Sequence, residues 1–180
     1  MTTVNLKTND LMPSFGKLPA TDGKKYSSGD FNEKKILIVV FSCNHCPYVQ
    51  AYEDRMIGIQ TGYSSKGLQL IAINSNEIKN YPEDSFEKMV DRAGKKKFNF
   101  VYLRDDDQSV ANAYGATHTP EFFVFDEKRK LRYRGKMDDN WERPESVKEN
   151  YLRDAIDALL AGKDEIVPET HSIGCTIKWG

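Results

Sequence analysis

The chain has 180 residues, a length typical of one domain, and its 39% hydrophobic and 29% charged residues are ordinary for a globular protein. Lys and Arg total 26 and Asp and Glu total 27, so the net charge of -1 argues against a nucleic-acid binder that relies on a global positive field. No apolar run is long enough for a membrane-spanning helix, and three cysteines are too few for a disulfide scaffold.

The first half of the chain predicts an N-terminal arm followed by alternating strands and helices. Residues 1–34 are expected to form extended pieces, with a hairpin turn at Asp22–Gly23. Residues 36–41 are a continuous apolar run rich in β-branched side chains, typical of a strand buried on both faces. A helix over 46–61, a second buried strand over 68–73 and a helix from Pro82 to about residue 93 follow.

The second half predicts a third strand over 98–103 and a short helix over 107–114 that Gly115 stops. Residues 121–126 and 131–135 resemble a hairpin, and 145–160 form the last helix, which ends before Gly162. The tail over 163–180 is expected to be irregular. This order predicts an α/β fold in which a central mixed β-sheet carries helices on both faces, with a core over 35–162 in a single domain of 1–180.

The N-terminal residues are polar and lack the basic and apolar segments of a signal peptide, which favours the cytoplasm, although a leader can have been trimmed from the chain. In a reducing compartment, the three cysteines are to be interpreted as catalytic, metal-binding or inert.

The strongest chemical signal is the segment Ser42-Cys43-Asn44-His45-Cys46-Pro47, a C-x-x-C directly after a buried strand and at the start of a helix. This spacing brings two sulfurs within bonding distance. The free N–H groups and positive dipole of the helix favour a thiolate on Cys43, which we expect to lie exposed beyond the helix end. Cys46, one turn inside the helix, is then the resolving thiol. The alternatives are a pair of core cysteines or half of a zinc site.

Together with the later segment Thr119-Pro120-Glu121, this motif resembles the thioredoxin superfamily. Pro13-Ser14-Phe15 and Asp22-Gly23-Lys24 resemble the branch shared by alkyl hydroperoxide reductase/thiol-specific antioxidant (AhpC/TSA) proteins and cytochrome-maturation-type thiol reductases. The resemblance implies a thioredoxin-like fold and a cis peptide bond at Pro120, which faces the cysteines beside Thr119. Without the resemblance, Pro120 is an ordinary trans turn proline.

Departures from thioredoxins concern the residues around the cysteines. Ser42 stands where thioredoxins have Trp, and Leu37 stands where they have a buried Asp that transfers protons. His45 resembles the C-x-H-C of disulfide isomerases and oxidases, and its protonated ring would stabilise the Cys43 thiolate; the alternative is a side chain in solvent. Glu121 is a second candidate proton carrier, or a polar strand residue. We expect Ser42, Asn44, His45, Thr119 and Pro120 to support the two catalytic cysteines.

Cys175, near the end of the chain, is either an accessory thiol that folds back to resolve or protect Cys43, or a small apolar residue packed beside Trp179.

These observations predict a thiol–disulfide oxidoreductase that exchanges disulfides with thiol proteins or small thiols and is recycled by a thioredoxin or glutathione system. No bound cofactor is implied, because the chain has neither a dinucleotide-binding motif nor a P-loop. A thiol-dependent peroxidase is the first alternative. It is weakened because the resembling peroxiredoxins place a Thr or Ser three residues before the reactive cysteine, and Val40 stands there before Cys43. A metal-binding or copper-delivery module using Cys43, Cys46 and a histidine is the second.

Overall fold

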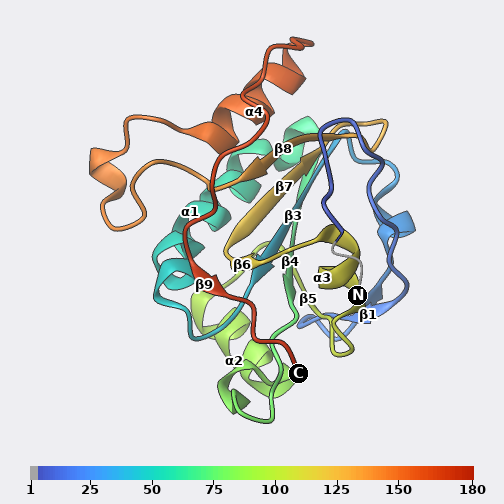
Figure 1. Cartoon of the computed structure of the whole chain (residues 1–180), viewed down its shortest axis with the longest axis vertical. Coiled ribbons are helices and arrows are strands. Elements are labelled where there is room, and N and C mark those ends of the chain that lie inside the picture. Colours follow the sequence, from blue (N-terminus) through green and yellow to red (C-terminus); the bar gives the residue numbers. More distant parts are fainter. Residues whose placement is uncertain (1–3) are drawn as a thin grey trace.

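A five-stranded mixed sheet forms the centre of the fold in the computed structural model, which describes residues 4–180 (Figure 1). The strand order is β5-β4-β3-β7-β8. β3 pairs with β4 and β4 with β5 in parallel, whereas β7 runs antiparallel to both β3 and β8. The predicted mixed sheet is therefore confirmed. The strands are β3 (Ile36–Ser42), β4 (Leu68–Asn74), β5 (Val101–Arg104), β7 (Glu121–Phe125) and β8 (Leu131–Gly135).

The central strand β3 supplies side chains to two separate cores because successive residues of a strand point to opposite faces. Ile36, Ile38 and Val40 face a core built with α1 (Pro47–Tyr63), α2 (Phe86–Lys96) and α4 (Tyr151–Leu160). Leu37 and Phe41 face a second core, which contains α3 (Ser109–Tyr114) and the N-terminal arm. Helices on both faces, as the sequence predicts, explain why all seven residues of β3 are buried.

Short elements complete the fold. In the arm, β1 (Leu18–Pro19) and β2 (Lys25–Tyr26) form the predicted hairpin around Asp22–Gly23. Single 3-10 turns cover Ser28–Phe31, Ser64–Lys66, Pro82–Asp84 and Pro144–Ser146. The strand β6 (His118–Thr119) leads into Pro120, and the Thr119–Pro120 bond is cis, as the resemblance implies.

Two predicted helices begin later than expected. The segment Pro82–Asp84 is a separate 3-10 turn, and α2 starts at Phe86 because the Ser85 hydroxyl caps it by accepting from the Lys88 N–H (3.3 Å). α4 starts at Tyr151 rather than 145, after the turn Pro144–Ser146 and an extended connection.

The tail is also more ordered than the sequence predicts. Its residues form β9 (Cys175–Thr176), which pairs antiparallel with β6. Figure 1 shows this red segment crossing the sheet end at β6 and continuing to the C-terminus near α2.

Within residues 4–180, none of the helices combines the length and the apolar character that a membrane crossing requires.

Candidate functional site

The two cysteines of the C-x-x-C motif lie between β3 and α1. Cys43 follows the last residue of β3, and α1 begins at Pro47. Cys46 is therefore the N-cap residue of α1 and not a residue one turn inside it, as the sequence analysis expected. The free N–H groups and the positive end of the helix dipole consequently lie next to Cys46.

Both cysteines are buried, which corrects the expectation of an exposed Cys43. Cys43 is 2% exposed and Cys46 is fully covered. Cys43 Sγ lies 3.5 Å from Thr119 Oγ1, and Cys46 Sγ lies 3.4 Å from the Thr119 carbonyl oxygen. Both thiols thus contact Thr119, the residue immediately before the cis bond to Pro120. The motif and the Thr-Pro segment, distant in sequence, form one site.

The pKa values of the two thiols are shifted in opposite directions. The Cys43 thiol, hydrogen-bonded to Cys46, lowers the pKa of Cys46 to about 4, and the Cys175 thiol and the Val49 N–H act in the same direction against burial. That same hydrogen bond, together with burial and the nearby charge of Asp84, raises the pKa of Cys43. These shifts give Cys46 the lower pKa of the two, whereas the sequence analysis expected the thiolate on Cys43.

Cys175 is the third member of this thiol cluster. Its Sγ lies 2.9 Å from Cys46 Sγ, and all three cysteines are free thiols. Burial and the neighbouring Cys46 raise the pKa of Cys175 to about 11. The fold-back that the sequence analysis considered is therefore present, but the sulfur it approaches is Cys46.

A buried carboxylate that the sequence analysis did not select, Asp84, lies beside the motif. It is fully buried and accepts hydrogen bonds from the Asn44 backbone N–H (2.7 Å) and from the side-chain amides of Asn74 and Asn76 (3.1 and 3.0 Å). His45 Nδ1 lies 2.6 Å from its Oδ2. Asp84 thus supplies a buried acid near Cys43, although Leu37 occupies the usual position for one.

The supporting residues predicted in the motif have different surroundings. The Asn44 amide donates to the Glu83 carbonyl (2.9 Å) and accepts from the Tyr102 hydroxyl (2.8 Å), so Asn44 ties the motif to β5. His45 stacks on Tyr81, with ring centroids 5.7 Å apart, and its side chain is 26% exposed. The ring therefore faces Asp84 from a half-buried position and not from open solvent. Ser42 is buried at the end of β3.

Glu121, the other proposed proton carrier, is engaged by a permanent cation. Arg134 donates to its Oε1 (2.8 Å), and the Thr117 and His118 N–H groups donate to its Oε2 (2.8 and 3.3 Å). The side chain therefore holds the backbone that leads into Pro120.

A metal site is the alternative for this cluster. The structure brings one ligand atom each of Cys43, His45 and Asp84 within 4.8 Å of one another, in place of the Cys43–Cys46–histidine set of the sequence analysis. Such sulfur, nitrogen and oxygen ligands suit Zn²⁺. Asp84 Oδ1 already accepts two amide hydrogen bonds and Oδ2 accepts one, so Oδ2 is the oxygen that a metal at this cluster would use.

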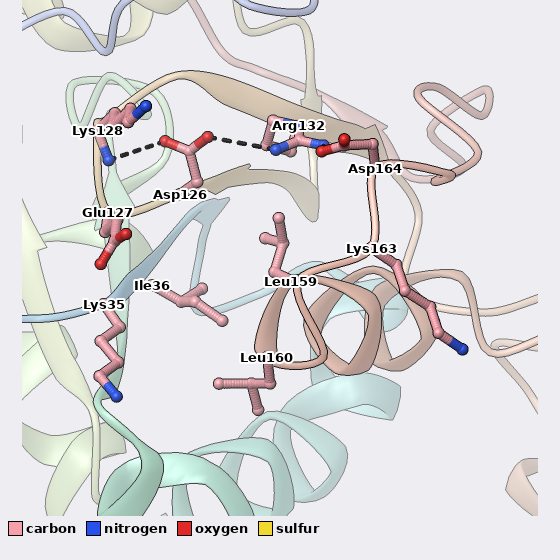
Figure 2. A pocket seen from close by; sticks show the side chains of 11 residues that line it. Lys35, Ile36, Asp126, Glu127, Lys128, Arg132, Leu159, Leu160, Lys163 and Asp164 are labelled. Atoms are coloured by element: carbon pink, nitrogen blue, oxygen red, sulfur yellow. Dashed lines mark hydrogen bonds and ion pairs between the residues drawn. The ribbon is translucent and has the colours of Figure 1, made fainter.

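A cavity lies at the opposite end of β3 from the cysteines. It measures about 400 Å³, and Figure 2 shows its lining at Lys35, Ile36 and the end of α4. Its Asp126 already accepts from the Lys128 N–H (2.9 Å) and pairs with Arg132 (3.4 Å). No cysteine lines it. The thiol cluster is therefore the candidate site.

Comparison with known proteins gives one family and many similar folds. The model of the Redoxin family matches residues 7–152, a span that contains Cys43, Cys46 and Pro120. A structure of a hypothetical protein from Sinorhizobium meliloti is 37% identical, covers 99% of this chain and 97% of its own, and has a TM-score of 0.88. A comparison with curated proteins finds no match.

Two further structures show the same fold at lower identity. One is described as a putative thiol:disulfide interchange protein DsbE from Chlorobium tepidum (20% identity, 87% of this chain and 99% of that chain, TM-score 0.70). The other is described as Peroxidoxin BcpB from Mycobacterium tuberculosis (16% identity, 87% and 96%, TM-score 0.65). These similarities agree with the thioredoxin-like fold that the sequence predicts.

Proposed function

The chain belongs to the Redoxin family, and from this premise we propose that it is a thiol–disulfide oxidoreductase acting through Cys43 and Cys46. The main observation behind the proposal is that both sulfurs contact Thr119, directly before the cis bond to Pro120. The similar fold of the Chlorobium tepidum protein, which is named a thiol:disulfide interchange protein, supports the same activity. The proposed partners are proteins or small molecules that carry thiols or disulfides.

The proposed reaction is two successive exchanges. The Cys43 thiolate attacks a partner's disulfide, so that a Cys43–partner bond forms and the partner's other sulfur leaves as a thiolate. Cys46 then attacks Cys43 Sγ, which forms the Cys43–Cys46 disulfide and releases the partner's second thiolate. A thioredoxin or glutathione system returns the pair to the dithiol. The proposed compartment is the cytoplasm, which favours this reducing direction.

Attack by Cys43 requires its thiolate, and in the arrangement with the tail docked the pKa of Cys43 is raised. The Cys175 thiol is one of the groups that lower the pKa of Cys46. When the tail moves away, Cys46 loses this contribution, so its pKa rises and its preference for the negative charge over Cys43 becomes smaller. We therefore assign the first attack to the state in which a partner has replaced the tail.

Trapping tests this assignment. The variant Cys46→Ser/Cys175→Ser keeps Cys43 but lacks both sulfurs that could resolve a mixed disulfide, so it should accumulate disulfide-linked partners that a reductant releases. The matched control Cys43→Ser/Cys175→Ser should trap few of them. Equal trapping by both variants would contradict the assignment of attack to Cys43, and no trapping by either would contradict the proposed function.

A thiol-dependent peroxidase is the second candidate, favoured by the Thr119 hydroxyl 3.5 Å from Cys43 Sγ, which sequence spacing alone did not provide. The similar fold of the Mycobacterium tuberculosis protein, which is named a peroxidoxin, points the same way. Sustained consumption of hydrogen peroxide with a thioredoxin recycling system, lost in Cys43→Ser, would establish this activity. Consumption that stops after one turnover would favour disulfide exchange.

A further inference from the structure

The C-terminal tail occupies the edge of β6, next to the thiols. In the antiparallel pair, Cys175 lies opposite Thr119 and Thr176 opposite His118. The Ile177 N–H donates to the Thr117 carbonyl (2.9 Å), and the Ile177 side chain is buried in the core that contains α3. An extended segment therefore covers the backbone directly before Pro120.

The chain beyond Ile177 is fixed to the loop that follows β4. The Glu77 N–H donates to the Lys178 carbonyl (2.8 Å), and the Lys178 N–H donates to the Asn76 side chain (2.9 Å). Asn76 is also a donor to Asp84 (3.0 Å). The tail thus binds the same polar network that holds the C-x-x-C motif.

Gly174 allows this close approach. A Cβ atom built on Gly174 would lie 2.1 Å from the Thr119 carbonyl oxygen and 2.7 Å from its carbonyl carbon. Such distances are far inside van der Waals contact, and the obstructing atoms are backbone that cannot turn aside. Any side chain at position 174 would therefore push the tail away from β6.

Docking places Cys175 against the buried sulfur of the pair. Cys46 is fully covered, and Cys175, which is partly exposed, lies 2.9 Å from it, longer than a disulfide bond of about 2.0 Å. Since strand addition to a sheet edge is a common way for proteins to bind extended peptides, the tail has the placement of a bound peptide whose cysteine faces the reactive thiols.

We propose that the C-terminal tail is an internal substrate: it pairs with the edge of β6 and presents Cys175 for disulfide exchange with Cys46. This inference rests on the proposed function, because it requires a Cys43–Cys46 disulfide formed by exchange with a partner's disulfide.

The disulfide exchange between Cys175 and Cys46 uses only sulfur atoms of this chain. The Cys175 thiolate attacks Cys46 Sγ of the Cys43–Cys46 disulfide, so the Cys46–Cys175 bond forms and the Cys43–Cys46 bond breaks. Cys43 leaves as a thiolate and takes up the proton that Cys175 loses. One disulfide and one thiol exist before and after the step, so no further oxidant is needed.

The state of Cys46 controls when Cys175 reacts. In the dithiol form, burial raises the pKa of Cys175, and both the hydrogen bond to Cys46 and its negative charge raise it further. A disulfide at Cys46 removes this charge. Cys175 is thus held as a thiol while the pair is reduced and ionises more readily when the pair is oxidised. The resulting Cys46–Cys175 bond fixes the tail on the edge of β6 and excludes a second partner from that edge.

The first experiment isolates the internal bond. Cys43→Ser, oxidised with glutathione disulfide and digested without reduction, should yield a peptide pair linked through Cys46 and Cys175 by mass spectrometry. Cys43→Ser/Cys175→Ser should instead carry glutathione on Cys46. The proposal is overturned if Cys43→Ser accumulates glutathione on both remaining cysteines, or links between chains, without the internal bond.

The second experiment tests docking in the full chain. In the Cys43→Ser background, Gly174→Val should slow formation of the internal bond about ten-fold or more, because Cys175 loses its high effective concentration at Cys46. In the wild-type background, Gly174→Val should raise the rate of insulin disulfide reduction several-fold. The control Gly16→Val places the same side chain where nothing lies within 4 Å, and should change neither rate. Unchanged rates in a folded Gly174→Val would overturn the proposal.

Failures of the two proposals give different results. Cys175→Ser retains Cys43 and Cys46, so the proposed function predicts that it forms their disulfide and reduces insulin. If it does so while Cys43→Ser forms no internal bond, only the tail proposal fails. If it does neither, the proposed function itself fails. If circular dichroism shows that Gly174→Val does not fold, the tail proposal is still tested by the first experiment, which compares Cys43→Ser with Cys43→Ser/Cys175→Ser.

Discussion

Two buried carboxylates hold the two chain segments that meet at the thiols, and their surroundings differ. Glu121 accepts from backbone N–H groups of the segment before Pro120 and pairs with the Arg134 guanidinium. Asp84 accepts from the Asn44 N–H inside the motif, and its ion-pair partner among residues 4–180 is the imidazole of His45. One carboxylate has a permanent cation and the other has a titratable neighbour.

The different partners of the two carboxylates indicate a structural role for Glu121 and a chemical role for Asp84. The cation beside Glu121 does not change with pH, because a guanidinium does not release a proton in proteins. Asp84 lies 2.6 Å from Nδ1 of the His45 imidazole, and its charge raises the pKa of Cys43. We therefore expect Glu121 to hold the fold and Asp84 to take part in proton movement at the pair.

The largest expected effect tests whether Glu121 stabilises the fold. Glu121→Gln leaves the nearly buried Arg134 without its anion, which should lower the free energy of unfolding by about 3–5 kcal/mol. Urea unfolding under reducing conditions measures it. Asp54→Asn, which removes the exposed partner of Lys96, is the matched control and should have little effect. Equal stabilities of the two variants would contradict a structural role for Glu121.

The second prediction concerns the chemical half. Asp84→Asn removes the charge that raises the pKa of Cys43, so that pKa should fall. Insulin reduction should nevertheless slow about a hundred-fold, a typical contribution of general acid–base catalysis, because the pair loses its nearby proton acceptor. The pH profile of the rate distinguishes this from misplacement of Asn44, which would lower the rate equally at all pH values.

Glu121→Gln provides the control for this second prediction, since per folded molecule it should reduce insulin at nearly the wild-type rate. A greater loss of rate in Glu121→Gln than in Asp84→Asn would reverse the assignment of the two carboxylates.

The sequence predicts most of the sheet because the relevant signals are local. The apolar run over 36–41 identifies β3 without knowledge of its neighbours, and the turn residues Asp22–Gly23 identify the arm hairpin. The C-x-x-C motif likewise carries its own spacing. The family resemblance, and not the residues alone, indicates the cis bond at Pro120.

The role of Asp84 was missed, and the tail was expected at Cys43 and not at Cys46, because both placements depend on distant contacts. Proline and acids at 82–84 favour the first turn of a helix, but Ser85 is the better cap, so the acid remains outside α2 and turns toward Asn44. A signal was present in the asparagines at 74 and 76, which follow β4 and supply amide donors to Asp84. β9 has only two residues, and its partner is set by long-range pairing with β6.

The smallest expected effect concerns Cys175, the third thiol of the cluster. Cys175→Ala removes a thiol that lowers the pKa of Cys46, so this pKa should rise, and the thiolate absorbance of Cys46 should disappear roughly one pH unit higher on acidification. Cys175→Ser keeps a hydroxyl donor and should shift the midpoint less.

The free energy of unfolding should also depend on the lowered pKa of Cys46. Because folding lowers the pKa of Cys46, its stabilisation is fully present above the ordinary thiol pKa and is lost as the pH falls through the folded value of about 4. Cys175→Ala should therefore be less stable than Cys175→Ser at neutral pH, and the difference should vanish below this value. A difference that persists in acid would mean that Cys175 stabilises the tail by packing alone, and Asp84 would then be the principal charge acting on the two thiols.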